Sequence, residues 1–366
     1  MKNLFAIWED LDRRFGAGVF YTALVLMLCS YAWFSFRVWN NEMHEILIFI
    51  RRLPLILFGI RIVLLGGRHP KYMLGCLLVS AVLFLSSRIT DNRELLRLGM
   101  AVMASREVRN RVTVRIYQWL YLLVPLAGLI LYLLGIAFDL QTHELGMEGH
   151  SWGLINPNVL AMLLFGFLLS VLLYVPLRRN GAVLAVCWTA AAVIWVLTLS
   201  KAVVLVLLLL PLFYMSLKKW KPSASLLALA PWGGLLLSVA LLLYFGPSDG
   251  ESTFESRFSI PYLSYLEHGL TWLGHRISPV AEDLPLDNVY LRHFLISGIL
   301  PGACVLTFYS HYLYRMGQVG NPMLLAMQCS VLLIGFMEFF PLDIVRNFLI
   351  LFYFIDEDGL RFFKKA

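Results

Sequence analysis

The chain has 366 residues, of which 60% are hydrophobic and only 14% are charged, and its mean hydropathy is +0.75. A soluble globular protein carries about a quarter charged residues, so this composition excludes an ordinary soluble domain. The net charge of +7 does not indicate a nucleic-acid partner, because Lys and Arg stand in short clusters between apolar runs. We therefore predict an all-α polytopic integral membrane protein in which residues 1–366 form a single membrane domain.

Apolar runs of about 20 residues, long enough to cross the hydrocarbon core of a bilayer as helices, recur along the whole chain. We expect about twelve transmembrane helices from this pattern. One apolar block, 181–217, is too long for one crossing and must turn, and the turn falls at Ser200-Lys201. The other expected helices lie near residues 17–36, 45–65, 72–87, 93–105, 113–138, 157–176, 224–246, 291–314, 322–340 and 344–356.

The placement of basic residues predicts the orientation of these helices. With the N-terminus inside, alternate connections are rich in Lys and Arg, as the positive-inside rule requires, and both termini are cytoplasmic. The basic residues of these connections are Arg68, Lys71, Arg106, Arg109, Arg111, Arg115, Arg178, Arg179, Lys218, Lys219, Lys221, Arg315, Lys364 and Lys365.

The longest polar interval, residues 247–292, lies between the expected ninth and tenth helices and is extracytoplasmic under this orientation. Near its start stand Glu255 and Arg257, and an arginine fork suits phosphate oxygens, although a surface arginine near lipid headgroups is an equal alternative. At its end, Asp287 either caps the next helix or places a carboxylate beside a sugar. Further polar and aromatic candidates at this end are Asn288, Tyr290 and Arg292.

The middle of the interval contains an aromatic residue, two histidines and another arginine. Trp272 offers a face for stacking on a sugar, and His268 or His275 offers an imidazole for proton transfer. A lone histidine is more often structural or solvated, so both residues also have this simpler interpretation. Arg276 is a further candidate cation.

Three other features fall on the same predicted side of the membrane. Lys201 either snorkels at a turn or binds phosphate as a point charge, with Ser200 beside it. Asn156 and Asn158 flank a proline that marks a helix start. Glu338 is a carboxylate at the membrane edge of a helix, which is a functional candidate by default. No nucleotide, dinucleotide or zinc motif is visible, so neither a cofactor nor a metal is expected.

These motifs, in this order, resemble the bacterial Wzy-type polymerases of O-antigen and capsular polysaccharide repeat units, members of the O-antigen polymerase/ligase superfamily. The resemblance covers roughly residues 110–350 and rests on three features. They are Asn156-Pro157-Asn158 opening a helix, Ser200-Lys201 between two helices, and a loop that opens near Arg257 and closes on Asp287-Asn288-Val289-Tyr290 before Gly298-Ile299. The family commonly has Ser-Arg at the turn, so Lys201 keeps the charge but loses the bidentate fork.

The resemblance implies a GT-C-like membrane fold and a metal-independent glycosyltransferase. It would polymerise undecaprenyl-diphosphate-linked oligosaccharide repeat units into O-antigen, capsule or exopolysaccharide. The site would face the periplasm or exterior from the bacterial inner membrane. The implied partners are the lipid-linked oligosaccharides, the lipid bilayer, a chain-length regulator and a repeat-unit flippase.

Residue roles follow from this implied reaction. Cationic side chains must stabilise the leaving diphosphate; the candidates are Arg257, Lys201, Arg276 and Arg292. A base or positioning group must act on the acceptor hydroxyl; the candidates are Asp287, Glu255, His268, His275 and Glu338. The remaining expected substrate contacts are Ser200, Asn156, Asn158, Asn288, Tyr290 and Trp272. The loop would form a lid and one wall of the site.

Three alternatives stay open. An O-antigen ligase shares this topology and chemistry, but a ligase-type histidine followed by a small polar residue is not evident in the loop, where His268 precedes Gly269 and His275 precedes Arg276. A transporter or flippase would use intramembrane charges, and Arg51, Arg52 and Arg61 keep this reading open. A scaffold of an envelope assembly would use the loop as a docking surface.

Overall fold

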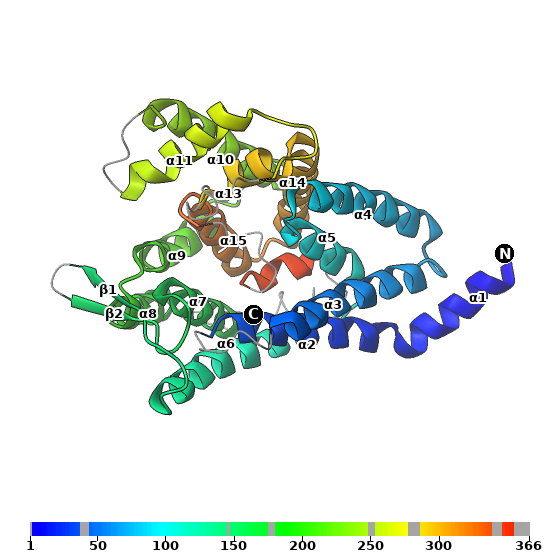
Figure 1. Ribbon diagram of the computed structural model, residues 1–366, viewed down its shortest axis with the longest axis horizontal. Helices are drawn as coiled ribbons and strands as arrows, with labels where there is room; N and C mark the ends of the chain where they lie inside the picture. The colour runs from blue at the N-terminus through cyan, green and yellow to red at the C-terminus, as the bar shows by residue number, and fades with distance from the viewer. Residues whose placement is uncertain are drawn as a thin grey trace. The chain divides into compact units, whose positions relative to one another are not determined.

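The structure is a computed structural model, and it describes residues 2–36, 44–144, 147–174, 180–247, 253–276, 286–338 and 346–354 (Figure 1). Within these ranges the chain is mainly helical, with one two-stranded hairpin, β1 (Gln141–Glu144) and β2 (Met147–His150). The chain divides into two compact units. The first comprises Met1–Cys76, Met100–Met215 and Phe354–Ala366, and the second comprises Leu77–Gly99 and Ser216–Tyr353.

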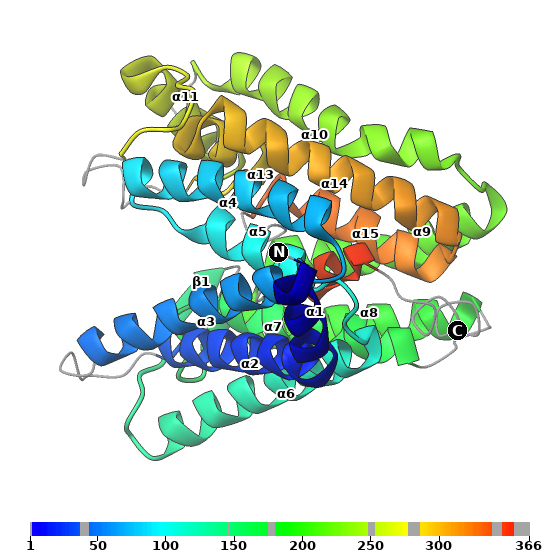
Figure 2. The ribbon, with the colours of Figure 1, turned by 90° about the vertical axis from the view of Figure 1, so that its right-hand side faces the viewer.

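The first unit is built mainly from long apolar helices. Helices α2 and α3 pack side by side, as do α6 and α7 (Figure 2). Phe20 of α2 and Phe58 of α3 are fully buried, and their ring centroids lie 5.7 Å apart. The elements are α1 (Lys2–Leu11), η1 (Asp12–Gly16), α2 (Ala17–Phe34), α3 (His44–Leu65), α6 (Asn110–Leu133), α7 (Pro157–Tyr174), α8 (Asn180–Thr198) and α9 (Lys201–Lys219), while α4 (Pro70–Thr90), α5 (Glu94–Ala104) and α9 each have residues in both units.

A buried ionic network holds the start of the chain against α3. The side chain of Asp12 is fully buried and that of Arg61 is 2% exposed, and the two form an ion pair. Asp12 also pairs with Arg68 at 2.6 Å, and Arg68 pairs with Glu107 at 2.6 Å. Arg61 donates a further hydrogen bond to the carbonyl of Arg106. A charge inside an apolar helix bundle needs such partners, and this network explains how α3 tolerates Arg61.

A carboxylate organises the connection between α6 and α7. Asp139 accepts hydrogen bonds from the backbone N–H of Ser151 at 2.8 Å and of Trp152 at 2.9 Å, and its Oδ2 lies 2.5 Å from Nδ1 of His150. Burial acts to raise the pKa of Asp139, but these donors outweigh it and lower the pKa. The resulting ionised carboxylate fixes the end of the β-hairpin at the turn that leads to α7.

Several helix boundaries confirm the expectations from the sequence. Helix α7 begins at Pro157, and the apolar block 181–217 is divided between α8 and α9. The turn between them contains Leu199, whose φ is +54°, and Ser200, whose backbone N–H donates to Thr198 Oγ1. The predicted turn at Ser200-Lys201 is therefore present.

The second unit places α10 and α14 side by side (Figure 2). Helix α11 lies against α10, where the buried ring of Phe258 stacks on Phe245 with centroids 6.1 Å apart. Asn321 caps α15 by accepting from the backbone N–H of Leu324. The elements are α10 (Ala224–Phe245), α11 (Thr253–His268), α13 (Val289–Arg292), η2 (His293–Ser297), α14 (Ile299–Val319), α15 (Pro322–Ile334) and η4 (Phe348–Phe354), whose last residue belongs to the first unit.

The expectation of one continuous helix over 291–314 is wrong. The chain breaks at Gly298, whose φ is +97°, and α14 begins only at Ile299. Gly298 passes so close to Gly274 that a Cβ on Gly298 would lie 2.2 Å from the Gly274 nitrogen. Beside this contact, Ile299 and Leu300 donate backbone hydrogen bonds to Thr271 and Trp272, and His275 donates to Ile296.

Six helices in the described ranges are long and apolar enough to cross a membrane, consistent with an α-helical membrane protein. They are Ile7–Phe34, Pro70–Thr90, Asn110–Leu133, Asn180–Thr198, Lys201–Lys219 and Ala224–Phe245. Two further apolar helices, Pro157–Leu173 and Pro322–Ile334, are shorter. The total of about twelve crossings stays a prediction, as do the sides on which the connections lie.

Candidate functional site

The second unit brings together the two ends of the polar interval. Arg257 of α11 forms an ion pair with Asp287, which precedes α13, with Nη1 and Oδ2 3.3 Å apart. The two side chains are 17% and 19% exposed, so the pair is shielded from solvent but still reachable. Glu255 lies on the same helix two residues before Arg257, a spacing at which side chains of a helix do not share a face.

The cap of α13 is Asn288 and not Asp287. The side-chain oxygen of Asn288 accepts from the backbone N–H groups of Tyr290 and Leu291, both at 3.1 Å. Its amide donates to the hydroxyl of Ser238 on α10, which fixes the segment to that helix. The capping role considered for Asp287 is therefore taken by its neighbour, and the carboxylate of Asp287 is available to Arg257.

Glu338 lies in the turn that follows α15, beyond the helix end at Ile334. The backbone N–H of Val289 donates to the carbonyl of Gly335, and the hydroxyl of Tyr290 donates to the carbonyl of Leu332. The ring of Tyr290 also packs on Phe336 with centroids 5.0 Å apart. These contacts fasten the turn that carries Glu338 to the segment that carries Asp287.

The two carboxylates interact with each other and with nearby arginines. Burial and the charge of Asp287 raise the pKa of Glu338 to about 7, while Arg257 and Arg346 oppose the shift. Burial also raises the pKa of Asp287, against the lowering effect of Arg257 and Arg292. Arg257, Asp287 and Glu338 thus form a charged cluster in which burial outweighs the nearby cations in setting the pKa of both acids.

Arg292 connects the cluster to Glu94, a residue that was not predicted from the sequence to belong to the site. Its Nη2 lies 3.4 Å from Oε2 of Glu94, the first residue of α5. Glu94 begins a short helix, where an acidic residue is usually explained by the helix dipole alone. The available signal was a carboxylate at the start of a mostly apolar helix, and its partner is 198 positions away in the sequence.

Other residues of the interval lie apart from the Arg257–Asp287 pair in their described contacts. Arg276 is exposed and pairs with the exposed Asp91. Trp272 is 73% exposed. The rings of His268 and His275 are 4.3 Å apart, and burial together with His268 lowers the pKa of His275. Neither ring nitrogen of His275 has a hydrogen-bond partner among the described residues.

Four predicted site residues belong to the first unit. Asn156 caps α7, because its side-chain oxygen accepts from the backbone N–H of Asn158 at 2.7 Å. Lys201 is exposed at the first position of α9, and Ser200 before it is buried. The Ser200 hydroxyl has no hydrogen-bond partner within the described ranges. The cap explains why an asparagine stands at 156, and nothing in the described contacts assigns a ligand to Lys201.

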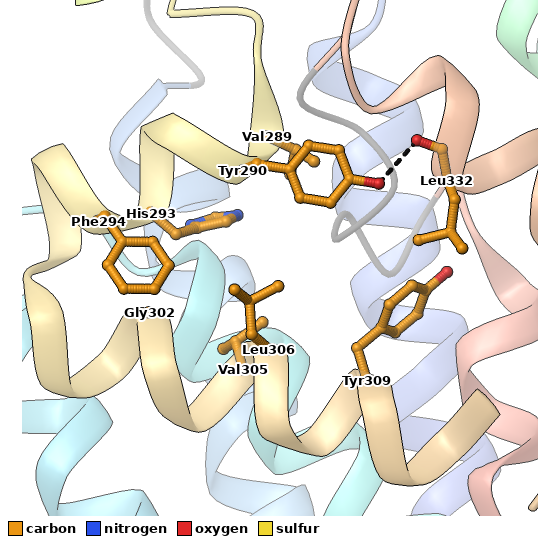
Figure 3. A pocket seen from close by; sticks show the side chains of 9 residues that line it. All are labelled: Val289, Tyr290, His293, Phe294, Gly302, Val305, Leu306, Tyr309 and Leu332. Carbon is orange, nitrogen blue, oxygen red and sulfur yellow. Dashed lines mark hydrogen bonds between the residues drawn. The ribbon is translucent and has the colours of Figure 1, made fainter. Parts of the chain in front are cut away.

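A small, mostly apolar pocket lies next to the charged cluster in the second unit. Phe294 and Gly302 border it on one side, and Tyr290 and Tyr309 border it on the other (Figure 3). His293 contributes a ring whose Nε2 has no hydrogen-bond partner in the described part of the chain. The full lining is Val289, Tyr290, His293, Phe294, Gly302, Val305, Leu306, Tyr309 and Leu332.

The described residues contain no group of three or more His, Cys, Asp or Glu side chains placed to hold a metal ion. The cluster instead combines arginine forks, which suit phosphate oxygens, with carboxylates, which can accept a proton. It could therefore bind an anionic group and support proton transfer beside it. No model of a known protein family, no curated protein and no solved structure matches the chain.

Proposed function

We propose that the protein is a metal-independent glycosyltransferase that polymerises undecaprenyl-diphosphate-linked oligosaccharide repeat units into a surface polysaccharide. The observation that supports this most is the meeting of Arg257, Asp287 and Glu338 in one partly buried cluster. The sequence placed these residues at opposite ends of a polar interval and in a later turn, and the proposed reaction needs a cation and a carboxylate together.

The proposed reaction is a displacement at the anomeric carbon of the donor glycan. A hydroxyl oxygen of the incoming repeat unit forms the new glycosidic bond, and the bond from the anomeric carbon to the diphosphate oxygen breaks. The bonding electrons leave with the undecaprenyl diphosphate, whose negative charge Arg257 stabilises, with Arg292 nearby. The hydroxyl proton passes to a carboxylate of the cluster.

The membrane setting of this proposal is the bacterial inner membrane, with the cluster on the periplasmic or exterior side and both termini in the cytoplasm. The six long apolar helices support a membrane location. A full set of about twelve crossings with a GT-C-like arrangement is part of the proposal. A transporter is favoured less, because Arg61, the buried one of the three arginines that kept this alternative open, is held by Asp12.

The proposal is tested in the native host by deleting the gene and examining the surface glycan. Loss of a polymerase leaves one repeat unit on each acceptor, whereas an unchanged ladder of chain lengths would refute the proposal. Complementation with Arg257→Ala is expected to lower chain extension by about 100-fold or more, since removing one donor to a developing oxyanion costs that much. Arg13→Ala, at an exposed arginine, is the matched control and should restore the ladder.

A further inference from the structure

We propose that Asp287 occupies the anion-binding position of Arg257 in the empty protein, that a phosphate group of the lipid diphosphate displaces it, and that the freed carboxylate takes the proton of the acceptor hydroxyl. This proposal rests on the proposed function and assigns the roles within its site. It makes donor binding and the supply of the base one event.

The first support is the loose geometry of the ion pair. Nη1 of Arg257 is buried and lies 3.3 Å from Asp287, yet it makes no aligned hydrogen bond with any residue in the described ranges. An arginine fork presents five N–H donors in a plane and binds best when two of them meet two oxygens. Asp287 therefore neutralises Arg257 without satisfying the donors at Nη1. A ligand that forms aligned hydrogen bonds with these donors would bind Arg257 more favourably than Asp287 does.

A phosphate group is such a ligand. The donor diphosphate carries two negative charges, against one on a carboxylate, and each of its phosphates offers two non-bridging oxygens that match the planar fork in two-point contact. Arg292, which also pairs with Glu94, lies close enough to Asp287 to affect its ionisation, so a second cation lies near the same anion. Exchange of Asp287 for one phosphate then replaces a loose ion pair with charge-assisted hydrogen bonds to the doubly charged diphosphate.

The second support is that Asp287 can leave Arg257 without unfolding its surroundings. The cap of α13 is made by Asn288, which is also hydrogen-bonded to Ser238. The backbone of Val289 is held by the carbonyl of Gly335. Asp287 has no part in these contacts, so a change of its side-chain rotamer is enough for the exchange.

The freed carboxylate has the properties of a base. Burial already favours the protonated form of Asp287, and Arg257 is the first of the two charges that oppose this effect. Once phosphate takes Arg257, that opposition is lost and the carboxylate becomes a stronger proton acceptor. The carboxylate then lies beside the phosphate that displaced it. The bond between the donor sugar and the diphosphate breaks at this place. The proton goes to Asp287 and the electron pair goes to the diphosphate.

The exchange is tested by binding to the full-length protein in detergent. The probes are undecaprenyl diphosphate and undecaprenol, which share the lipid chain and differ in charge. Asp287→Asn should bind undecaprenyl diphosphate about tenfold more tightly than the wild type, because the competing anion is gone. Arg257→Gln should bind it at least about tenfold more weakly. Undecaprenol should bind all variants equally.

Two comparison variants separate exchange from general charge removal. Glu338→Gln removes a carboxylate from the same cluster without touching the ion pair, and it should tighten binding by less than Asp287→Asn does. Asp10→Asn, at an exposed carboxylate of the first unit that pairs with Arg14, should bind like the wild type. A melting temperature for each variant identifies any loss that comes from misfolding.

The proton role is tested by chain extension in the host. Asp287→Asn is expected to bind the donor more tightly and yet lose chain extension. Tighter binding with normal extension would refute the role of Asp287 as base, and binding no tighter than the wild type would refute the exchange. Normal extension in Asp287→Asn with loss in Glu338→Gln would move the base to Glu338. Failure of the proposed function looks different, because the wild type would then discriminate poorly between the two lipids and deletion would leave the ladder intact.

Discussion

Removing the carboxylate of Asp12 should destabilise the protein severely. In Asp12→Asn, the guanidinium of Arg61 would stay 2% exposed without its counter-ion, and Arg68 would lose a contact of 2.6 Å. Breaking a buried ion pair by removing one partner costs about 3–5 kcal/mol, because the remaining charge is uncompensated. The hydrogen bond from Arg61 to the carbonyl of Arg106 remains, which places the expected loss near the lower end of that range.

The assay is reversible unfolding of the purified protein in mixed detergent micelles, followed by circular dichroism. Asp10→Asn is the matched control, because Asp10 makes an exposed pair with Arg14 one helical turn away and should contribute less than about 1 kcal/mol. The double variant Asp12→Leu/Arg61→Met should recover most of the loss, since replacing both charges with apolar groups is often neutral or stabilising. A loss for Asp12→Asn as small as that for Asp10→Asn would refute the account of the buried network.

Two further predictions concern the second unit. Glu338→Gln should raise the melting temperature at pH 8 and change it little near pH 4. The pKa of Glu338 in the folded protein is raised from 4.5 to about 7, so the protein loses stability as the pH rises through this interval, by at most about 3 kcal/mol. An equal effect of the substitution at both pH values would contradict this. Gly298→Ala should cost more than about 2 kcal/mol, because φ is +97° and the added methyl meets the backbone of Gly274, whereas Gly233→Ala, with open space at its Cβ on α10, should be neutral or stabilising. Thermal unfolding of both variants tests this, and similar melting temperatures would contradict it.

The sequence predicted local features well where the deciding interaction is local. Pro157 begins α7 because its missing N–H and fixed φ suit the first turn of a helix. The turn at Ser200 follows from the length of the apolar block, which exceeds one crossing of a bilayer. These inferences need only neighbouring residues and the thickness of a membrane.

Ion pairs between residues far apart in the sequence could not be predicted in this way. Arg61 interrupts an apolar run in the sequence, and its partner Asp12 lies in a different helix. Arg257 and Asp287 were named as the two ends of one interval, but their direct contact depends on how α11 packs against α10. Glu94 was missed because its partner, Arg292, lies far along the chain. Asp287 and Asn288 are both good caps by residue type, so only the geometry shows that Asn288 is used.

The contacts around Gly298 bear on the entropy of the polar interval. With Thr271, Trp272 and His275 hydrogen-bonded to the 296–300 segment, and α11 packed through Phe258, much of the described interval is already ordered before any ligand arrives. A freely hinged lid would lose conformational entropy on closing over a substrate, and affinity would fall by that amount. In this protein much of the conformational entropy of the interval is already lost during folding, so the interval acts more as a preorganised wall than as a lid. The amides of Ile299 and Leu300, which donate to carbonyls of the interval, should then exchange with solvent as slowly in the free protein as in the presence of lipid diphosphate.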